Sequence, residues 1–198
     1  MLQNYSEACE RNQQPILEIL QHYLLPEHRV LEIGSGSGQH ALFCVDTLQH
    51  PHWQPSELHE NLAALNHNLA LFNLPGIQPA LTLDASDPPT LPHQYELLFT
   101  ANTLHIMSWQ SVQDLIALAG EIIAPDGFMV VYGPFRYQNA YTSPSNAAFD
   151  QWLKQRDPLS GIRDFEALEA LANKVGLMLL KDWPMPANNQ CLVWQKQG

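Results

Sequence analysis

The stretch Val30-Leu31-Glu32-Ile33-Gly34-Ser35-Gly36-Ser37-Gly38-Gln39-His40 places three alternate glycines directly after a short apolar run. Such a run is typical of a buried strand, and the residues after Gly38 follow the pattern of a helix. Glycine lets the backbone pass close to a ligand and tolerates positive φ, and the first turn of a helix offers unpaired N–H groups. Glu32 adds a carboxylate at the end of the strand. The pattern predicts a binding site for a nucleotide-type cofactor.

Three kinds of cofactor loop share this order of strand, glycines and helix. A phosphate-binding P-loop requires a lysine after the glycines, and none follows Gly38. The dinucleotide fingerprint G-x-G-x-x-G/A fails from Gly34 because its sixth position is Gln39. It can be counted from Gly36 to Ala41, but its first glycine then lies two residues beyond the strand end. The pattern E-x-G-x-G-x-G fits the strand end directly and resembles the S-adenosylmethionine loop of class I methyltransferases.

The charged residues are unevenly distributed along the chain. Nine Lys and Arg residues stand against 20 Asp and Glu residues, for a formal net charge of −11. After Arg29 neither Lys nor Arg occurs until Arg136, so the predicted cofactor half offers no such cation to a pyrophosphate or a ribose phosphate. S-adenosylmethionine has no phosphate and carries a positive sulfonium, which an acidic pocket suits. The overall charge is equally consistent with a role in solubility, but the long gap in basic residues favours this cofactor.

Length and composition limit the class of protein. A chain of 198 residues is enough for one domain with a full core and too short for two ordinary domains. The three cysteines lie far apart without a C-x-x-C pair, which predicts reduced thiols in a cytoplasmic protein. The polar start of the chain lacks the order of a signal peptide, and no apolar run approaches the roughly 18 residues of a membrane span. With a sequence pI near 5.1 and no basic stripe, neither nucleic acid nor a membrane is an expected partner.

Helical and strand patterns alternate along the chain, which predicts a parallel sheet covered by helices on both faces. The expected strands are 29–33, 53–58, 78–83, 95–101, 128–132, 177–183 and 191–195. The expected helices are 13–25, 37–48, 59–73, one that begins after the N-cap Ser108, 145–155 and 165–175. An irregular stretch is expected over 133–144.

Five strand-helix units followed by a strand hairpin resemble the class I methyltransferase fold. This is a three-layer, Rossmann-like α/β fold with a mostly parallel seven-stranded sheet whose last strand is antiparallel. Further motifs look like the largely uncharacterised family that includes methyltransferase-like protein 26, among them Glu10-Arg11-Asn12, Pro55-Ser56-Glu57, Ala101-Asn102-Thr103-Leu104-His105-Ile106 and Gly161-Ile162-Arg163-Asp164. The resemblance implies one methyltransferase domain over 1–198, with 1–28 as an N-terminal helical cover and 133–165 as a substrate-side insertion. It does not specify the substrate.

The resemblance also implies roles for the glycine loop and the strand before it. Gly34, Gly36 and Gly38 would line the methionine end of the cofactor. Glu32 would hold the amino group of the cofactor, directly or through water.

Glu57 ends the second expected strand, roughly 20 residues after the glycines, where a carboxylate can hold a ribose. There it can accept hydrogen bonds from both ribose hydroxyls, and we expect it to face solvent in the crevice. Glu60 is a rival, although a carboxylate in the first turn of a helix also has a purely electrostatic role. Dinucleotide enzymes use the same placement, so Glu57 alone does not separate the two kinds of cofactor.

The next two strand ends carry the remaining cofactor candidates. Asp84 resembles the residue that accepts the adenine amino hydrogen, with the backbone N–H of Ala85 facing the ring; the alternative for Asp84 is a cap or turn residue. Asn102 and His105 are the candidate catalytic residues. Asn102 ends the fourth strand beside the expected methyl-donor position, and histidine titrates near neutrality. His105 is equally consistent with a packing residue. No Asn-Pro-Pro-Tyr run follows this strand, so the chain does not resemble nucleic-acid amino methyltransferases.

Polar residues near the expected carboxyl edge would form a substrate mouth, because ligands bind there in open α/β sheets. These residues are Tyr132, Arg136, Tyr141, Arg163 and Asp164. Arg11 and Asn12 would cover the cofactor from the N-terminal helix. Surface ion pairs or loop anchors explain each of these residues equally well. No metal is expected, because the closest group of histidines lacks the spacing of a zinc site; this group is His50, His52 and His59.

The favoured function is an S-adenosylmethionine-dependent methyltransferase that acts on a small molecule. The sulfonium already activates the methyl group, so the protein would mainly align a nucleophile with it. The rival is a non-catalytic S-adenosylmethionine-binding protein that uses the fold as an interaction module, and the intact glycine loop and ribose carboxylate count against it. A nicotinamide-dependent dehydrogenase is the third candidate.

Overall fold

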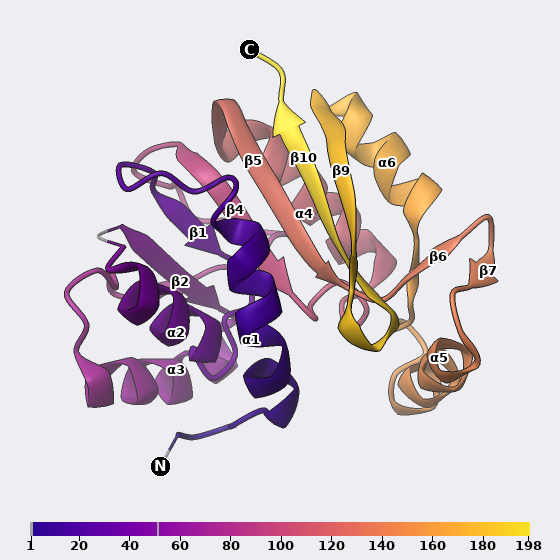
Figure 1. The fold of residues 1–198 in the computed structure, drawn as a ribbon, viewed down its shortest axis with the longest axis horizontal. Coiled ribbons are helices and arrows are strands. Elements are labelled where there is room, and N and C mark those ends of the chain that lie inside the picture. Colours follow the sequence, from indigo (N-terminus) through magenta and orange to yellow (C-terminus); the bar gives the residue numbers. More distant parts are fainter. Residues whose placement is uncertain (1, 51) are drawn as a thin grey trace.

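A seven-stranded sheet forms the centre of the computed structural model, which describes residues 2–50 and 52–198 (Figure 1). From one edge to the other, the strands are β3 (Leu81–Thr82), β2 (Trp53–Glu57), β1 (Val30–Glu32), β4 (Tyr95–Ala101), β5 (Ile123–Gly133), β10 (Asn189–Lys196) and β9 (Leu177–Met185). Strands β1 to β5 run parallel, and β10 is antiparallel to both of its neighbours. The predicted α/β fold with an antiparallel last strand is confirmed.

Helices cover both faces of this sheet (Figure 1). On one face lie α1 (Glu7–Leu20), α2 (Gln39–Leu48) and α3 (His59–Phe72), and on the other lie α4 (Trp109–Ile122) and α6 (Phe165–Lys174). The N-cap predicted at Ser108 is confirmed, because its hydroxyl accepts a hydrogen bond from the Ser111 N–H at 3.0 Å.

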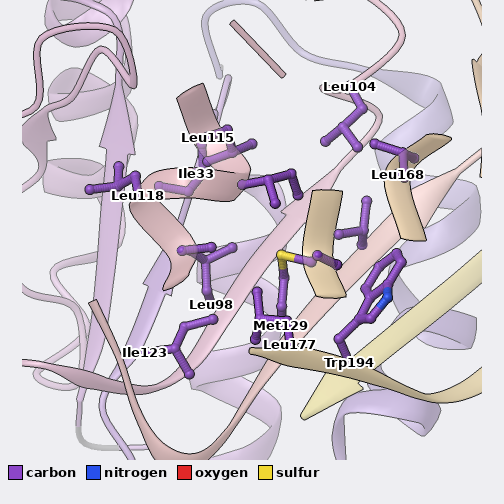
Figure 2. Close-up of a cluster of buried hydrophobic side chains, with 14 of the residues drawn as sticks. Ile33, Leu98, Leu104, Leu115, Leu118, Ile123, Met129, Leu168, Leu177 and Trp194 are labelled. Atoms are coloured by element: carbon purple, nitrogen blue, oxygen red, sulfur yellow. The ribbon is translucent and has the colours of Figure 1, made fainter. Parts of the chain in front are cut away.

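The core is divided between the two faces of the sheet because successive strand residues point in opposite directions. On β4, the Leu98 side chain packs with the cluster under α4 and α6, which includes Trp194 (Figure 2). The neighbouring Phe99 packs with the cluster under α1 and α2, which includes Trp53. A strand buried on both faces reads as a continuous apolar run, which is why the bounds of β4 could be predicted.

The N-terminal helix differs from the predicted range of 13–25 at both ends. It begins at Glu7, after Ser6, whose hydroxyl accepts a hydrogen bond from the Cys9 N–H at 3.3 Å. The helix ends at Leu20, and the following residues form turns. Apolar periodicity marks only the buried stretch that starts at Ile16, so it gives no signal for the polar first turns.

The stretch expected to be irregular over 133–144 contains two short strands. β6 (Phe135–Tyr137) pairs with β7 (Ala140–Tyr141) and β8 (Arg163–Asp164) in a separate three-stranded sheet. Between β7 and β8 lies α5 (Pro144–Arg156), which Figure 1 shows beyond one end of the main sheet. β5 begins at Ile123, upstream of the expected 128–132, and contains the Pro125-Asp126-Gly127 segment within a stretch of irregular register.

No helix in residues 2–50 and 52–198 is both long and apolar enough to cross a membrane.

Candidate functional site

A cavity of about 510 Å³ opens at the carboxyl edge of the parallel strands. Most of the predicted cofactor residues line it, and they come from the ends of four neighbouring strands: Gly34, Gly36, Glu57, Asp84, Ala85 and Asn102. This edge is where ligands bind in open α/β sheets. The structure therefore brings together residues that are up to 68 positions apart in the sequence, from Gly34 to Asn102.

All three glycines of the loop have positive φ, but the space around each of them differs. At Gly36 (φ +56°) a Cβ would meet nothing within 4 Å, so the backbone leaves open space toward the cavity. At Gly34 a Cβ would lie 3.0 Å from the Thr103 side chain. Gly38 is the N-cap of α2, and its Cβ would lie 3.0 Å from the side chains of Leu65 and Leu69. Gly38 does not line the cavity, so its predicted contact with the cofactor is replaced by a packing role.

Glu57 is buried, with 7 % of its surface exposed. One carboxylate oxygen accepts a hydrogen bond from the Gly36 N–H at 2.8 Å. The other accepts from the Leu58 N–H at 2.9 Å and from the Asn61 amide at 3.2 Å. The expectation of a free, solvent-facing carboxylate was wrong, because the glycine loop and the start of α3 bring donors to it. Glu60 is exposed and does not line the cavity.

Glu32 lies beneath the glycine loop and not in the cavity. The residue is 2 % exposed, and its carboxylate accepts a hydrogen bond from the Trp53 indole at 3.0 Å. Burial raises the pKa of Glu32 to about 7, although the hydrogen bond from Trp53 opposes this shift. The predicted hold on the amino group of a cofactor therefore does not match the direction of this side chain, which points to the packed side of β1.

Asp84 combines the two roles that the sequence left open. It is exposed and lines the cavity beside Ala85. One of its oxygens also accepts hydrogen bonds from the Ser86 N–H at 2.9 Å and the Ser86 hydroxyl at 2.7 Å. These bonds lower the pKa of Asp84, so the group stays ionised.

Asn102 lines the cavity from the end of β4, as predicted. Its backbone is left-handed, with φ +58°, and its N–H donates to the Tyr132 carbonyl at 2.9 Å. His105, the predicted base, does not line the cavity. The residue is 7 % exposed, its ring packs edge-on against Phe149, and burial lowers its pKa to about 4. The catalytic role proposed for His105 is therefore not supported by its position.

None of the residues predicted for a substrate mouth lines the cavity. Arg163 donates to the carbonyls of Leu104 and Leu159 and to that of Met107, and so fixes the loop after β4. Arg136 lies over the Tyr141 ring, with 5.6 Å between its guanidinium carbon and the ring centre. Asp164 accepts a hydrogen bond from the Asn139 N–H. Arg163 and Asp164 thus anchor loops, and the substrate role of the five residues stays a prediction.

The two residues of the N-terminal helix that were predicted to cover the cofactor, Arg11 and Asn12, differ in their exposure. Arg11 is exposed and forms an ion pair with Glu7 at 3.5 Å. Asn12 and Tyr132 are both buried, and neither lines the cavity. Within residues 2–50 and 52–198, no three His, Cys, Asp or Glu side chains are grouped as metal ligands.

Residues 3–196 match the model of the protein family described as "Protein of unknown function (DUF938)". The chain belongs to this family.

The fold of this DUF938 member is similar to that of solved methyltransferase structures. An O-methyltransferase family protein from Burkholderia thailandensis matches with a TM-score of 0.79 at 15 % identity, over 97 % of this chain and 58 % of that one. Human N-acetylserotonin methyltransferase, solved in complex with S-adenosylmethionine, matches with a TM-score of 0.80 at 14 % identity, over 97 % and 53 %. The CcbJ methyltransferase from Streptomyces caelestis matches with a TM-score of 0.72 at 17 % identity, over 94 % and 90 %. The chain thus spans little more than half of the first two proteins, and the likeness shows the class I methyltransferase fold.

Sequence reasoning missed the part of the cavity wall that the N-terminal segment of this DUF938 member supplies. Asn4, Ser6 and Cys9 line the cavity together with His40. Gln39 holds this segment in place, because its amide oxygen accepts from the Ser6 N–H at 2.7 Å and its amide nitrogen donates to the Ser6 carbonyl at 3.1 Å. The only hint of this wall in the sequence is the pair of polar residues directly after the glycines, Gln39 and His40.

The other missed lining residues flank the predicted strand ends. They are Ile33, Ser35, Ser37, Leu58, Asn61, Leu83, Ala101, Thr103, Ile106, Met107 and Ser111. All of them are apolar or uncharged, so nothing in their type marks them as binding residues in the sequence.

Proposed function

We propose that this chain is an S-adenosylmethionine-dependent methyltransferase that acts on a small-molecule acceptor. The observation that carries the proposal is the single cavity in which the glycine loop, Glu57, Asp84 and Asn102 meet at the ends of β1, β2, β3 and β4. Its volume of about 510 Å³ lies within the roughly 300–1,000 Å³ of small-molecule sites.

The residues present fit this cofactor by their charge. No Lys or Arg occurs among the described residues that line the cavity, whereas Glu57 and Asp84 do. A dinucleotide or a nucleoside triphosphate would bring phosphate charge into a site without a cationic side chain. S-adenosylmethionine brings a positive sulfonium and no phosphate, so the same site favours it electrostatically.

Each cavity residue has a defined capacity to hold part of the cofactor. A carboxylate offers about four acceptor positions, and three of those of Glu57 are used by Gly36, Leu58 and Asn61. Glu57 therefore retains one position for a ribose hydroxyl. Asp84 retains acceptor capacity for the adenine amino group, and the open space at Gly36 admits the amino-acid part.

When bound, the cofactor supplies a methyl group that its sulfonium has already activated. The task of the chain is then to orient the acceptor and exclude water, which in favourable cases contributes roughly 7–11 kcal/mol. We propose that residues 1–28 and 133–165 enclose the acceptor side. Ser6 and Cys9 line the cavity from the first segment, and Arg163 fixes the rim residue Met107 from the second.

The test is methyl transfer from isotope-labelled S-adenosylmethionine into a metabolite extract. Incorporation into a small molecule, absent without the protein, is the expected result. Binding of the cofactor without any incorporation would favour the alternative, a non-catalytic S-adenosylmethionine-binding module. Membership of the family that includes methyltransferase-like protein 26 remains part of this proposal.

A further inference from the structure

His40 is a buried imidazole whose polar atoms have no partner. It lies in the first turn of α2, lines the cavity and is 4 % exposed. Neither ring nitrogen makes a hydrogen bond within the described part of the chain. The ring packs edge-on against Phe99 of β4, with 5.8 Å between the ring centres. Buried polar groups are nearly always hydrogen-bonded, so this ring is arranged for a partner that enters the cavity.

A second unpaired polar atom lies on α1, the helix that packs against α2. The Asn12 side chain is 8 % exposed, and its Oδ1 has no hydrogen-bond partner among the described residues. Cys9 is one turn earlier on the same face of α1 and lines the cavity. The region between α1, α2 and the sheet is therefore buried, polar and incompletely hydrogen-bonded.

The chemistry of the His40 ring nitrogens determines which ligand group can pair with them in the cavity. A neutral imidazole has one nitrogen that accepts a hydrogen bond and one that donates. Burial lowers the pKa of His40 to about 4, so the ring is neutral at neutral pH. With no Lys or Arg among the described lining residues, an anionic group would find no opposite charge here. A hydroxyl or an amine supplies the missing donor.

We propose that the part of the cavity between Cys9 and His40 is the subsite of the methyl acceptor, where His40 accepts a hydrogen bond from a hydroxyl or amine of that molecule. The inference rests on the proposed function. The other possible occupant is the amino-acid end of the cofactor. We place this end at Gly36 instead, where the backbone leaves open space toward the cavity.

Two cofactor analogues separate these occupants. S-adenosylhomocysteine has the amino-acid end and lacks the methyl group. Sinefungin has the same amino-acid end and carries an amine in the place of the methyl group, so its amine points toward the acceptor. Calorimetry on the full chain measures the affinity for each of the two ligands, in the wild type and in His40→Leu. The matched control is His105→Leu, because His105 is also buried and edge-on to a phenylalanine but lies outside the cavity.

We expect His40→Leu to weaken the affinity for sinefungin by about tenfold or more and to change the affinity for S-adenosylhomocysteine by less than about twofold. His105→Leu should change neither. A second readout uses the wild type alone, so it does not depend on a variant that folds: the ring nitrogen resonances of isotope-labelled His40 should shift with sinefungin and not with S-adenosylhomocysteine.

If His40→Leu weakened the binding of both ligands equally, or if both ligands shifted the His40 resonances equally, His40 would be assigned to the amino-acid end and the proposal would be overturned. An unaltered His40 resonance in a complex with sinefungin would also overturn it. If the wild type binds neither ligand, the proposed function itself fails, which is a different result from the other two.

Discussion

The Gly36 backbone N–H donates a hydrogen bond of 2.8 Å to the Glu57 carboxylate. This bond joins the glycine loop after β1 to the end of β2, so the two features that predict a cofactor site in the sequence are also one structural unit. Glu57 consequently has two tasks, to hold the loop and to hold a ligand. A substitution there is expected to affect both stability and binding.

Glu57→Ala removes the acceptor of two backbone N–H groups, those of Gly36 and Leu58, and of the Asn61 amide. We expect the free energy of unfolding to fall by about 1–3 kcal/mol, since buried donors lose their partner. The affinity for S-adenosylhomocysteine should weaken by about 1.5–3 kcal/mol, the value of a hydrogen bond to a charged group. Glu57→Gln should do less damage because one amide oxygen still accepts. Urea denaturation and calorimetry measure the two effects.

Glu60→Ala is the matched control, three residues away on α3 and exposed. It should change stability by less than about 0.5 kcal/mol and leave binding unaltered. If the control weakened binding and Glu57→Ala did not, the ribose would be held from α3 and not from the end of β2.

Gly36→Asn should prevent cofactor binding and leave the fold intact. Asparagine tolerates the left-handed backbone that Gly36 adopts at φ +56°. Its side chain would occupy the open space on the cavity side of the loop. The control is Gly176→Asn, which has a similar φ of +76° and meets only the Lys196 side chain. Calorimetry with S-adenosylhomocysteine should show loss of binding for the first variant only. If Gly36→Asn bound S-adenosylhomocysteine as tightly as Gly176→Asn and the wild type do, the glycines would form only a turn and would not contact a ligand.

Glu32 should make the stability of the fold depend on pH. Burial raises its pKa from 4.5 to about 7, so the folded state favours the protonated carboxyl. The contribution of this group is fully present below about pH 4.5 and is lost as the pH rises through about 7. Glu32→Gln keeps an oxygen for the Trp53 indole and carries no charge. Relative to the wild type, its free energy of unfolding should increase by up to about 3 kcal/mol between about pH 4 and pH 8. Urea denaturation across this range measures it, and a difference that does not change with pH would show that the pKa of Glu32 is not raised in the folded state.

The sequence predicted those parts of the fold that local pattern determines. The bounds of β4 follow from a continuous apolar run, and the start of α4 follows from the cap at Ser108. The glycine loop, Glu57, Asp84 and Asn102 were placed at one edge because parallel strands end there together. Their meeting in one cavity needed no information beyond the order of the elements.

The errors concern the direction of side chains. Residues two apart on a strand share a face, so Glu32 points to the same side as Val30, toward α2 and Trp53. That alternation is visible in the sequence, but the position at a strand end suggested an exposed carboxylate. The orientation of His105 depends on Phe149 of α5, 44 residues later, and no local pattern carries it. His40 reaches the cavity because α1 and α2 pack together. Like the orientation of His105, this depends on tertiary structure that no local pattern indicates.

Calorimetry on the purified wild type with S-adenosylhomocysteine and with NAD tests whether the cavity binds S-adenosylmethionine. We expect micromolar affinity for S-adenosylhomocysteine and no measurable heat of binding with NAD, because the lining of the cavity has Glu57 and Asp84 but neither Lys nor Arg among its described residues. Binding of NAD that equals or exceeds that of S-adenosylhomocysteine would contradict it.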